Sequence, residues 1–341
     1  MTTTSTPRQG FDPALAAGKV PHYGDPLAEA AALRDRAAIV DRSYVGRLAL
    51  VGADRQRFLN GLVTCDVKAL TTGRGAYGFF TDPKGRVLAD LVVVALAEAL
   101  WLELPPGSSA AIAAHLRKYI IADRVEVLEL EDRVPLTLAG PQAAAALGEP
   151  PLDDAWQQCS LEIAGASVIC VREGRLGVPG FTLWVQAADA APVRRELLGR
   201  ESVLPAGFDA LEMVRVEGGV SRYGQDFGAE HFPQETGAEA AAVSYTKGCY
   251  LGQEVVARIH YRGGVQRALR GLRFAGDPPP LGTQVLGEGR ESGAITSIAR
   301  SPRCGAIGLG VLHQRVGEVG SEVRLENGEP ATLVALPFEN R

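Results

Sequence analysis

The chain has 341 residues, of which 46% are hydrophobic, so it is long enough to build well-filled cores in two or three domains. Its formal net charge of −5 argues against broad, nonspecific binding to nucleic acid, which needs a basic face, although a local basic cleft is compatible with it. Residues 1–10 lack an apolar core, and no apolar run reaches the ~18 residues that a membrane span requires. We therefore expect a soluble, cytoplasmic protein without membrane association or stable nucleic-acid binding.

The cysteines also limit the possible chemistry. The five of them, at positions 65, 159, 170, 249 and 304, form neither a CxxC pair nor a cluster with ligand-like spacing. The sequence therefore predicts no resident metal ion or iron–sulfur cluster. Their odd number is typical of a reducing compartment.

The first part of the chain predicts an α+β subdomain. Residues 1–24 are polar and irregular, so we expect a flexible tail there. Asp25 is then a candidate N-cap and Pro26 occupies the first helical position, which predicts a helix to about residue 38. Further elements follow in the order β-α-β-β-β-α-β: strand 47–51, helix 54–60, strands 76–80, 87–96 and 101–104, helix 109–118 and strand 125–130.

A similar order recurs in the second part, which predicts a second α+β subdomain. Its elements are strand 134–139, helix 141–146, strands 161–163, 168–172 and 181–185, and helix 190–198. Beyond Arg267, short apolar runs alternate with glycines, as in a small β-barrel, at 270–274, 283–286, 293–298, 306–312 and 322–325. We expect a tail at 1–24, two similar α+β subdomains within 25–267, and a β-barrel domain at 268–341.

The chemically most specific stretch is KGCYLGQEVVAR, residues 247–258. Gly248 and Gly252 permit positive φ angles, so we expect Cys249 on a tight loop that presents its sulfur to a cavity. Residues 253–258 contain no helix breaker and predict a short helix, whose N-terminal dipole together with Lys247 favours the thiolate. The alternative is that Cys249 packs as a small buried hydrophobe.

The pattern K-G-C-Y-x-G-Q-E, followed by Ala-Arg, resembles the signature of the YgfZ family of folate-binding proteins, which are relatives of the aminomethyltransferase (T-protein) of the glycine cleavage system. Similar patterns extend from about residue 27 to the C-terminus. The resemblance implies two ferredoxin-like α/β subdomains and a C-terminal β-barrel around a central channel that binds tetrahydrofolate or another reduced folate. It also implies a role in making or repairing iron–sulfur clusters in client proteins, including tRNA-modifying (thiomethylating) enzymes.

Asp90 is the leading candidate for folate contact, because it is a carboxylate within an otherwise apolar strand and is costly to bury unpaired. Its carboxylate suits the amino group and ring N–H of a pterin, although a salt bridge or backbone hydrogen bond is the simpler role. The segment 85–91 resembles a T-protein stretch with two adjacent acids, the first of which is Ala89 here. At a second position, where T-proteins use a glutamate on the pterin, this chain has Val178. Both departures predict that aminomethyl transfer is absent.

The other candidate folate contacts are less specific. Tyr77 and Tyr250 can stack on a ring, but lone tyrosines are commonly core residues. Arg215 lies in a passage that resembles the family's Arg-x-Glu-x-Gly pattern and is as readily structural. From the motif itself we assign Gln253, Glu254 and Arg258 to folate binding, with a solvated basic face as the alternative for the arginine.

The resemblance thus implies a tetrahydrofolate-binding protein that assists iron–sulfur cluster assembly or repair, and the motif points to Cys249 and Lys247 as its reactive pair. Cys249 would act in redox chemistry or transient cluster ligation, since the other cysteine ligands of a permanent cluster are absent. The alternative is a folate-dependent aminomethyltransferase or other one-carbon transferase, and a third hypothesis is a scaffolding protein without chemistry.

Overall fold

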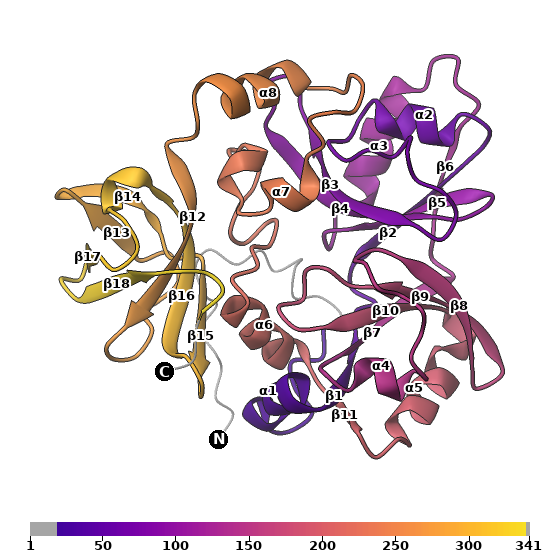
Figure 1. Cartoon of the computed structure of the whole chain (residues 1–341), viewed down its shortest axis with the longest axis horizontal. Coiled ribbons are helices and arrows are strands. Elements are labelled where there is room, and N and C mark those ends of the chain that lie inside the picture. Colours follow the sequence, from indigo (N-terminus) through magenta and orange to yellow (C-terminus); the bar gives the residue numbers. More distant parts are fainter. Residues whose placement is uncertain (1–18, 339–341) are drawn as a thin grey trace.

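The computed structural model describes residues 19–338, and its strands form three sheets (Figure 1). Residues 1–18 of the expected tail and residues 339–341 lie outside the described residues. Residues 19–24, also expected in the tail, run against the chain near residue 208: Phe208 N–H donates to the Val20 carbonyl and Asp209 N–H to the Pro21 carbonyl, each at 2.9 Å. These six residues are mostly exposed, and the two backbone hydrogen bonds hold them along the chain there.

The first sheet has antiparallel strands in the order β3 (Gly75–Thr81), β4 (Val87–Ala95), β5 (Ala99–Leu104), β2 (Gly46–Val51) and β6 (Glu126–Glu129). Helices α2 (Arg55–Asn60) and α3 (Ser109–Tyr119) cover one face and bury Leu59 and Leu116 against it. Each of these elements lies within a few residues of its predicted position, because apolar runs bounded by glycine and proline mark their ends clearly.

The second sheet has the order β11 (Val203–Pro205), β1 (Ala37–Asp41), β7 (Arg133–Ala139), β10 (Gly180–Gln186), β9 (Ala166–Arg172) and β8 (Gln158–Ile163). Helices α4 (Ala143–Ala146) and α5 (Ala190–Leu198) pack on its core. The helix expected to reach residue 38 is α1 (Pro26–Asp35), and Ala37 already begins β1. The expectation was wrong because pairing of β1 with β7 and β11 outweighs the helix propensity of its alanines. The short strand β11 was not predicted.

The third sheet has the order β14 (Arg290–Ala294), β13 (Gln284–Gly287), β17 (Glu322–Leu325), β18 (Pro330–Val334), β12 (Arg267–Phe274), β16 (Gly305–His313) and β15 (Ser297–Ser301). It curls around a core that includes Leu272, Leu312 and Leu333. Since β14 and β15 are edge strands that do not pair with each other, the expected small barrel is a half-barrel that hydrogen bonds do not close.

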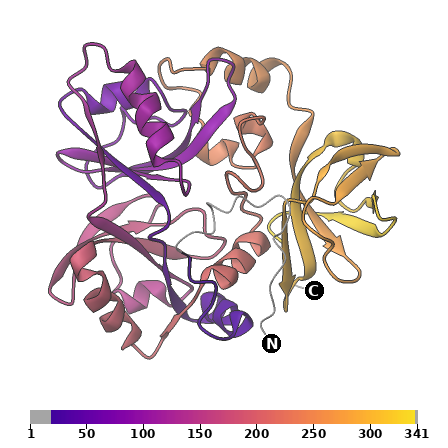
Figure 2. The same cartoon turned by 180° about the vertical axis from the view of Figure 1, so that it is seen from behind.

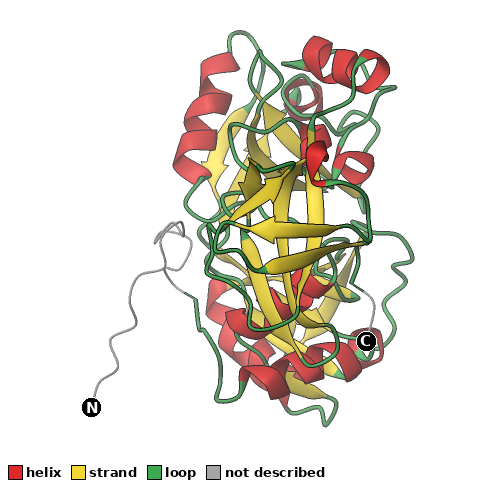
Figure 3. Cartoon of the chain, turned by 90° about the vertical axis from the view of Figure 1, so that its left-hand side faces the viewer, coloured by secondary structure: helices red, strands yellow, loops and turns green. Residues whose placement is uncertain are grey.

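The three sheets surround the segment that runs from α6 (Phe208–Glu217) to α7 (Glu239–Ala242) (Figure 1; Figure 2). Helix α6 packs against α1 through Leu211 and Val214, and against the half-barrel through Val216. In the side view most strands lie in the middle of the molecule and the longer helices at its periphery (Figure 3). Within residues 19–338, no helix is long and apolar enough to cross a membrane.

Candidate functional site

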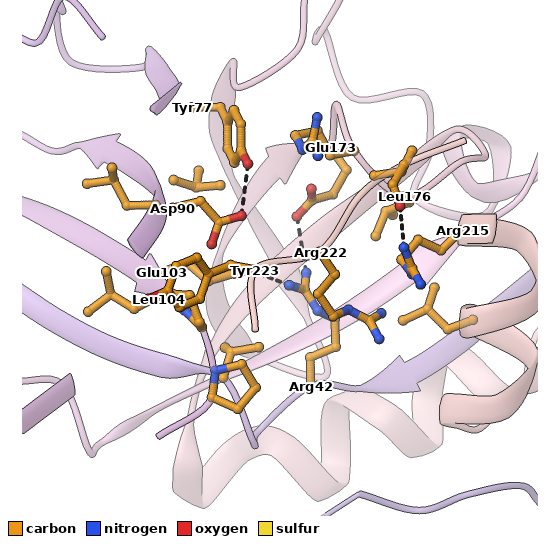
Figure 4. A pocket seen from close by; sticks show the side chains of 18 of the residues that line it. Arg42, Tyr77, Asp90, Glu103, Leu104, Glu173, Leu176, Arg215, Arg222 and Tyr223 are labelled. Carbon is orange, nitrogen blue, oxygen red and sulfur yellow. Dashed lines mark hydrogen bonds and ion pairs between the residues drawn. The ribbon is translucent and has the colours of Figure 1, made fainter. Parts of the chain in front are cut away.

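A pocket of about 140 Å³ lies where the first two sheets meet the segment after α6 (Figure 4). One wall comes from β4 and β5, the opposite wall from the residues around β8 and β9, and the third from residues 211–223. Its polar and charged lining residues are Lys19, Arg42, Tyr44, Tyr77, Asp90, Glu103, Glu173, Arg175, Arg215, Ser221, Arg222 and Tyr223. Carboxylates and cations from distant parts of the chain therefore share one cavity.

Asp90 and Tyr77 form the acidic wall of the pocket. The Tyr77 hydroxyl donates a 2.8 Å hydrogen bond to Oδ2 of Asp90 across the β3–β4 pair. Burial raises the pKa of Asp90, while this hydrogen bond and the nearby Arg175 oppose the shift. Two of the predicted folate-contact residues, Tyr77 and Asp90, thus lie together in the pocket, where Tyr77 holds the carboxylate through Oδ2.

The side chains along β4 alternate between two faces from Ala89 onward. Ala89, Leu91 and Val93 lie in the core beneath helices α2 and α3. Asp90 lies on the opposite face and lines the pocket. An acid at position 89 would therefore enter the core and not the pocket. The argument that Ala89 removes a catalytic acid is corrected by this register.

Arg42 joins the two α+β parts across the pocket. It follows β1 directly, donates through Nη2 to Glu103 on β5, and lies with Nη1 3.4 Å from Oε1 of Glu173, just beyond β9. All three side chains are at most 13% exposed. The Thr182 hydroxyl also donates to Glu173. Burial raises the pKa of Glu173, and Arg42 opposes that shift.

Aromatic rings and a further cation complete the wall opposite β3. Trp156, whose φ of 68° is unusual for a bulky residue, stacks on Tyr77 at a centroid distance of 6.0 Å. The Arg175 guanidinium lies 4.5 Å from the Tyr77 ring centroid and donates to the Ser221 carbonyl. Trp156 and Arg175 thus both pack on the Tyr77 ring, and all three residues line the pocket.

Several of these pocket residues were missed from the sequence. Glu103 carried the same signal as Asp90, a carboxylate in the apolar strand at 101–104, and could have been found by it. Arg175 lies three residues before Val178, the second position where this chain departs from T-proteins, and Val178 packs against the core between α1 and α6. Arg42, Glu173 and Arg222 had no distinguishing local pattern.

Arg215 lines the pocket, but its donors are occupied by protein groups. It pairs with Glu212 and with Asp226, where Nη1 lies 2.8 Å from Oδ2, and it donates to the Ser297 hydroxyl on β15. Its side chain is 4% exposed. The structure thus gives Arg215 a role in joining α6 to the half-barrel, and its assignment to folate contact is corrected.

The KGCYLGQE stretch forms a loop on the other side of the first sheet. Leu251 packs against the core beneath α2 and α3, and the Thr81 hydroxyl donates to its carbonyl at 2.5 Å. Cys249 is exposed on this loop and is not among the residues that line the pocket. Cys249, which was expected to present its sulfur to a cavity, thus lies outside the pocket that Asp90 lines.

Lys247 points inward from the same loop. Its ammonium group donates to the carbonyls of Asn60, Val63 and Cys65 at 2.8, 2.7 and 2.6 Å. The residue is 7% exposed, whereas Cys249 is exposed. Its expected role as the partner that activates the thiol is corrected to that of a structural anchor for the loop.

The remaining motif residues lie at or near α8 (Gln253–Arg262), a helix that the sequence predicted. Tyr250 is buried, and its ring lies 5.2 Å from Nζ of Lys247. Gln253 accepts a hydrogen bond from the Tyr250 N–H, while Glu254 and Arg258 are exposed. None of these four is among the residues that line the described pocket, so the structure does not bring them to Asp90.

Comparison with known proteins gives a consistent result over nearly the whole chain. Residues 23–247 match the GCVT N-terminal domain, and residues 267–339 match the glycine cleavage T-protein C-terminal barrel domain. The chain is 29% identical over 333 residues to the aminomethyltransferase of Rubrobacter xylanophilus, covering 94% of this chain and 87% of that protein. It is 27% identical to a putative chloroplastic transferase of Arabidopsis thaliana, covering 88% of this chain and 71% of that protein.

A solved structure shows the same architecture. The glycine cleavage system aminomethyltransferase T from Bartonella henselae superposes with a TM-score of 0.84 at 26% sequence identity. The match covers 94% of this chain and 92% of that one.

Proposed function

Because the chain belongs to the glycine cleavage T-protein family, we propose that its pocket binds tetrahydrofolate or another reduced folate. The observation that carries this proposal is the half-buried Asp90 carboxylate, which the Tyr77 hydroxyl holds on the pocket wall. A carboxylate pairs well with an amino group and a ring N–H side by side, which is the edge that a pterin offers. Tyr77 and Trp156 supply aromatic surface next to it.

Calorimetric titration with tetrahydrofolate under anaerobic conditions tests this proposal. We expect Asp90→Asn to weaken binding by about 10- to 100-fold, because a charge-assisted pair of hydrogen bonds is lost. Asp154→Asn is the matched control, since the Asp154 side chain is 73% exposed. Absence of binding by the folded wild-type protein would refute the folate assignment, and unchanged affinity in Asp90→Asn would refute only the role of Asp90.

For the biological role we propose a function of the YgfZ type, in which the folate-bound protein assists iron–sulfur cluster assembly or repair in client enzymes, including tRNA-thiomethylating ones. The exposed position of Cys249, on a loop outside the pocket, supports this proposal. A thiol outside the pocket is accessible to a partner protein and not to the bound folate. The thiolate is the form that ligates or reacts.

Complementation tests this role. In a strain that lacks the native protein, we expect Cys249→Ser to fold and bind folate as the wild type does but to fail to restore iron–sulfur enzyme activity. Cys159→Ser is the control on a half-buried cysteine. Full rescue by Cys249→Ser would assign Cys249 to the loop's packing and remove the thiol from the mechanism.

Aminomethyl transfer is the second candidate function, and two observations favour it. The first is that the aminomethyltransferases among the relatives match along most of their length. The second is that Asp90 supplies an acid on the pocket face, whereas Ala89 lies in the core, so the missing acid at position 89 does not change the pocket. An assay with aminomethylated lipoyl carrier protein and tetrahydrofolate separates the two candidates. Methylene-tetrahydrofolate formed above background, and lost in Asp90→Asn, would establish the transferase.

A further inference from the structure

Glu173 stands across the pocket from Asp90 and comes from a different sheet. Asp90 is on β4 of the first sheet, whereas Glu173 follows β9 of the second. Both carboxylates point toward the middle of the pocket (Figure 4). A flat ligand that donates one edge to Asp90 therefore presents its opposite edge to the wall that contains Glu173.

The two oxygens of Glu173 have different surroundings. Oε1 accepts from the Thr182 hydroxyl and lies 3.4 Å from Nη1 of Arg42. Among residues 19–338, the hydrogen bonds and ion pairs that Glu173 makes all use Oε1, so Oε2 is left for a ligand. The Glu173 side chain is only 7% exposed, so bulk water has little access to Oε2. A hydrogen-bond donor on a bound ligand would therefore stabilise this oxygen.

We propose that Glu173 reads the reduction state of the bound ring: its Oε2 accepts a hydrogen bond from a ring N–H that a reduced folate has and an oxidised folate lacks. This inference rests on the proposed folate binding. Tetrahydrofolate carries N–H groups at both N5 and N8, dihydrofolate only at N8, and folic acid at neither. A carboxylate can only accept, so bare ring nitrogens of folic acid place lone pair against lone pair.

Arg42 and Thr182 both contact the Glu173 carboxylate. Burial and the nearby Glu103 raise the pKa of Glu173, whereas Arg42 and the Thr182 hydroxyl favour its charged, accepting form. Arg42 also binds Glu103, which fixes the guanidinium between the two walls. Arg42 is in this sense a positioning residue for Glu173.

The test is the ratio of the dissociation constants of folic acid and tetrahydrofolate, measured anaerobically by calorimetry. We expect wild type to prefer tetrahydrofolate and Glu173→Gln to reduce that preference by about 10-fold, because the amide nitrogen can donate to a bare ring nitrogen. The affinity of dihydrofolate shows which ring nitrogen donates. Its dissociation constant should be close to that of tetrahydrofolate if N8–H is the donor, and close to that of folic acid if N5–H is the donor.

Two controls isolate the contact. Glu162→Gln makes the same change on the exposed part of the same hairpin and should leave the ratio unchanged. Glu103→Gln alters the other partner of Arg42 and should change the ratio less than Glu173→Gln does. If Glu173→Gln fails to fold, Glu173→Asp replaces it: the shorter side chain retains the charge but places its oxygens farther from the ligand. We expect the same loss of preference for tetrahydrofolate.

The possible outcomes distinguish a failure of the Glu173 proposal from a failure of the proposed folate binding. Failure of wild type to bind any folate overturns the proposed function itself. Binding of tetrahydrofolate with the same preference in wild type and Glu173→Gln leaves folate binding intact and overturns the role of Glu173. A preference for folic acid in wild type would mean that Glu173 donates as a protonated acid, and it overturns the role equally.

Discussion

Ala89 and Asp90 are neighbours along β4, yet their side chains lie on opposite faces of the first sheet. Ala89 is fully buried in the core beneath α2 and α3, and Asp90 lines the pocket. Two adjacent acids at these positions, as in the T-protein stretch, could not both face the pocket. The strand period assigns one position to the pocket and the other to the core.

Ala89→Asp should therefore damage the fold without helping catalysis. The new carboxylate enters an apolar core without a partner, so we expect the free energy of unfolding to fall by at least about 3 kcal/mol. Ala97→Asp, in the exposed turn between β4 and β5, should change it by no more than about 0.5 kcal/mol. Urea unfolding measures both variants. A stable Ala89→Asp protein with aminomethyltransferase activity absent from wild type would contradict the assigned register.

The charged Asp90 side chain should lower the free energy of unfolding at neutral pH, because it is partly removed from water in the pocket. Burial raises its pKa in the folded protein above the unfolded value of about 3.9. Between those two pKa values the folded state binds more protons, so the free energy of unfolding falls as pH rises through that window. We expect Asp90→Asn to be more stable than wild type at pH 7, and the gain to shrink as pH falls toward 3. Thermal unfolding at several pH values measures it, and a variant less stable than wild type at pH 7 would show that the charged form is well compensated.

The sequence predicts the fold well where local signals and packing agree. The elements of the first sheet are each bounded by glycine, proline or a cap, and the structure has them in the expected order. β1 was missed because Ala37 and Ala38 continue a helical composition, and only their pairing partners on β11 and β7 make them a strand. Such pairing is nonlocal and leaves no mark on the segment itself.

The candidate site was predicted in the same uneven way. Asp90 was found because a carboxylate in an apolar strand needs an explanation. Arg42 and Glu173 are 131 positions apart and meet because β1 and β9 lie in one sheet, separated by β7 and β10, and no spacing in the sequence encodes that strand order. For Cys249 the loop and following helix were predicted, but the face of the sheet was not, since Leu251 decides it by packing into the core.

The Arg42 bridge should contribute much more to stability than an exposed bridge of similar span. Removing one partner of a buried ion pair leaves Glu103 and Glu173 uncompensated, so we expect Arg42→Met to lower the free energy of unfolding by about 3–5 kcal/mol. Arg74→Met removes a pair with Asp154 that also joins the two α+β parts, but those side chains are 51% and 73% exposed. We expect a change within about 0.5 kcal/mol there. Equal effects of the two variants in urea unfolding would mean that burial does not set the strength of these contacts.

Lys247 should contribute to the stability of the fold, whereas the reactivity of Cys249 should not depend on it. Lys247→Met leaves the carbonyls of Asn60, Val63 and Cys65 without their donor, so we expect the free energy of unfolding to fall by about 2–4 kcal/mol. Lys84→Met, on an exposed turn, is the control and should leave the free energy of unfolding unchanged.

Limiting iodoacetamide should modify Cys249 before the other four cysteines, because Cys65, Cys170 and Cys304 are buried and Cys159 is half-buried. In folded Lys247→Met the alkylation rate of Cys249 should match that of Lys84→Met, since the ammonium group is directed at the carbonyls. A stable Lys247→Met protein whose Cys249 reacts markedly more slowly would restore the lysine as the activator of the thiol.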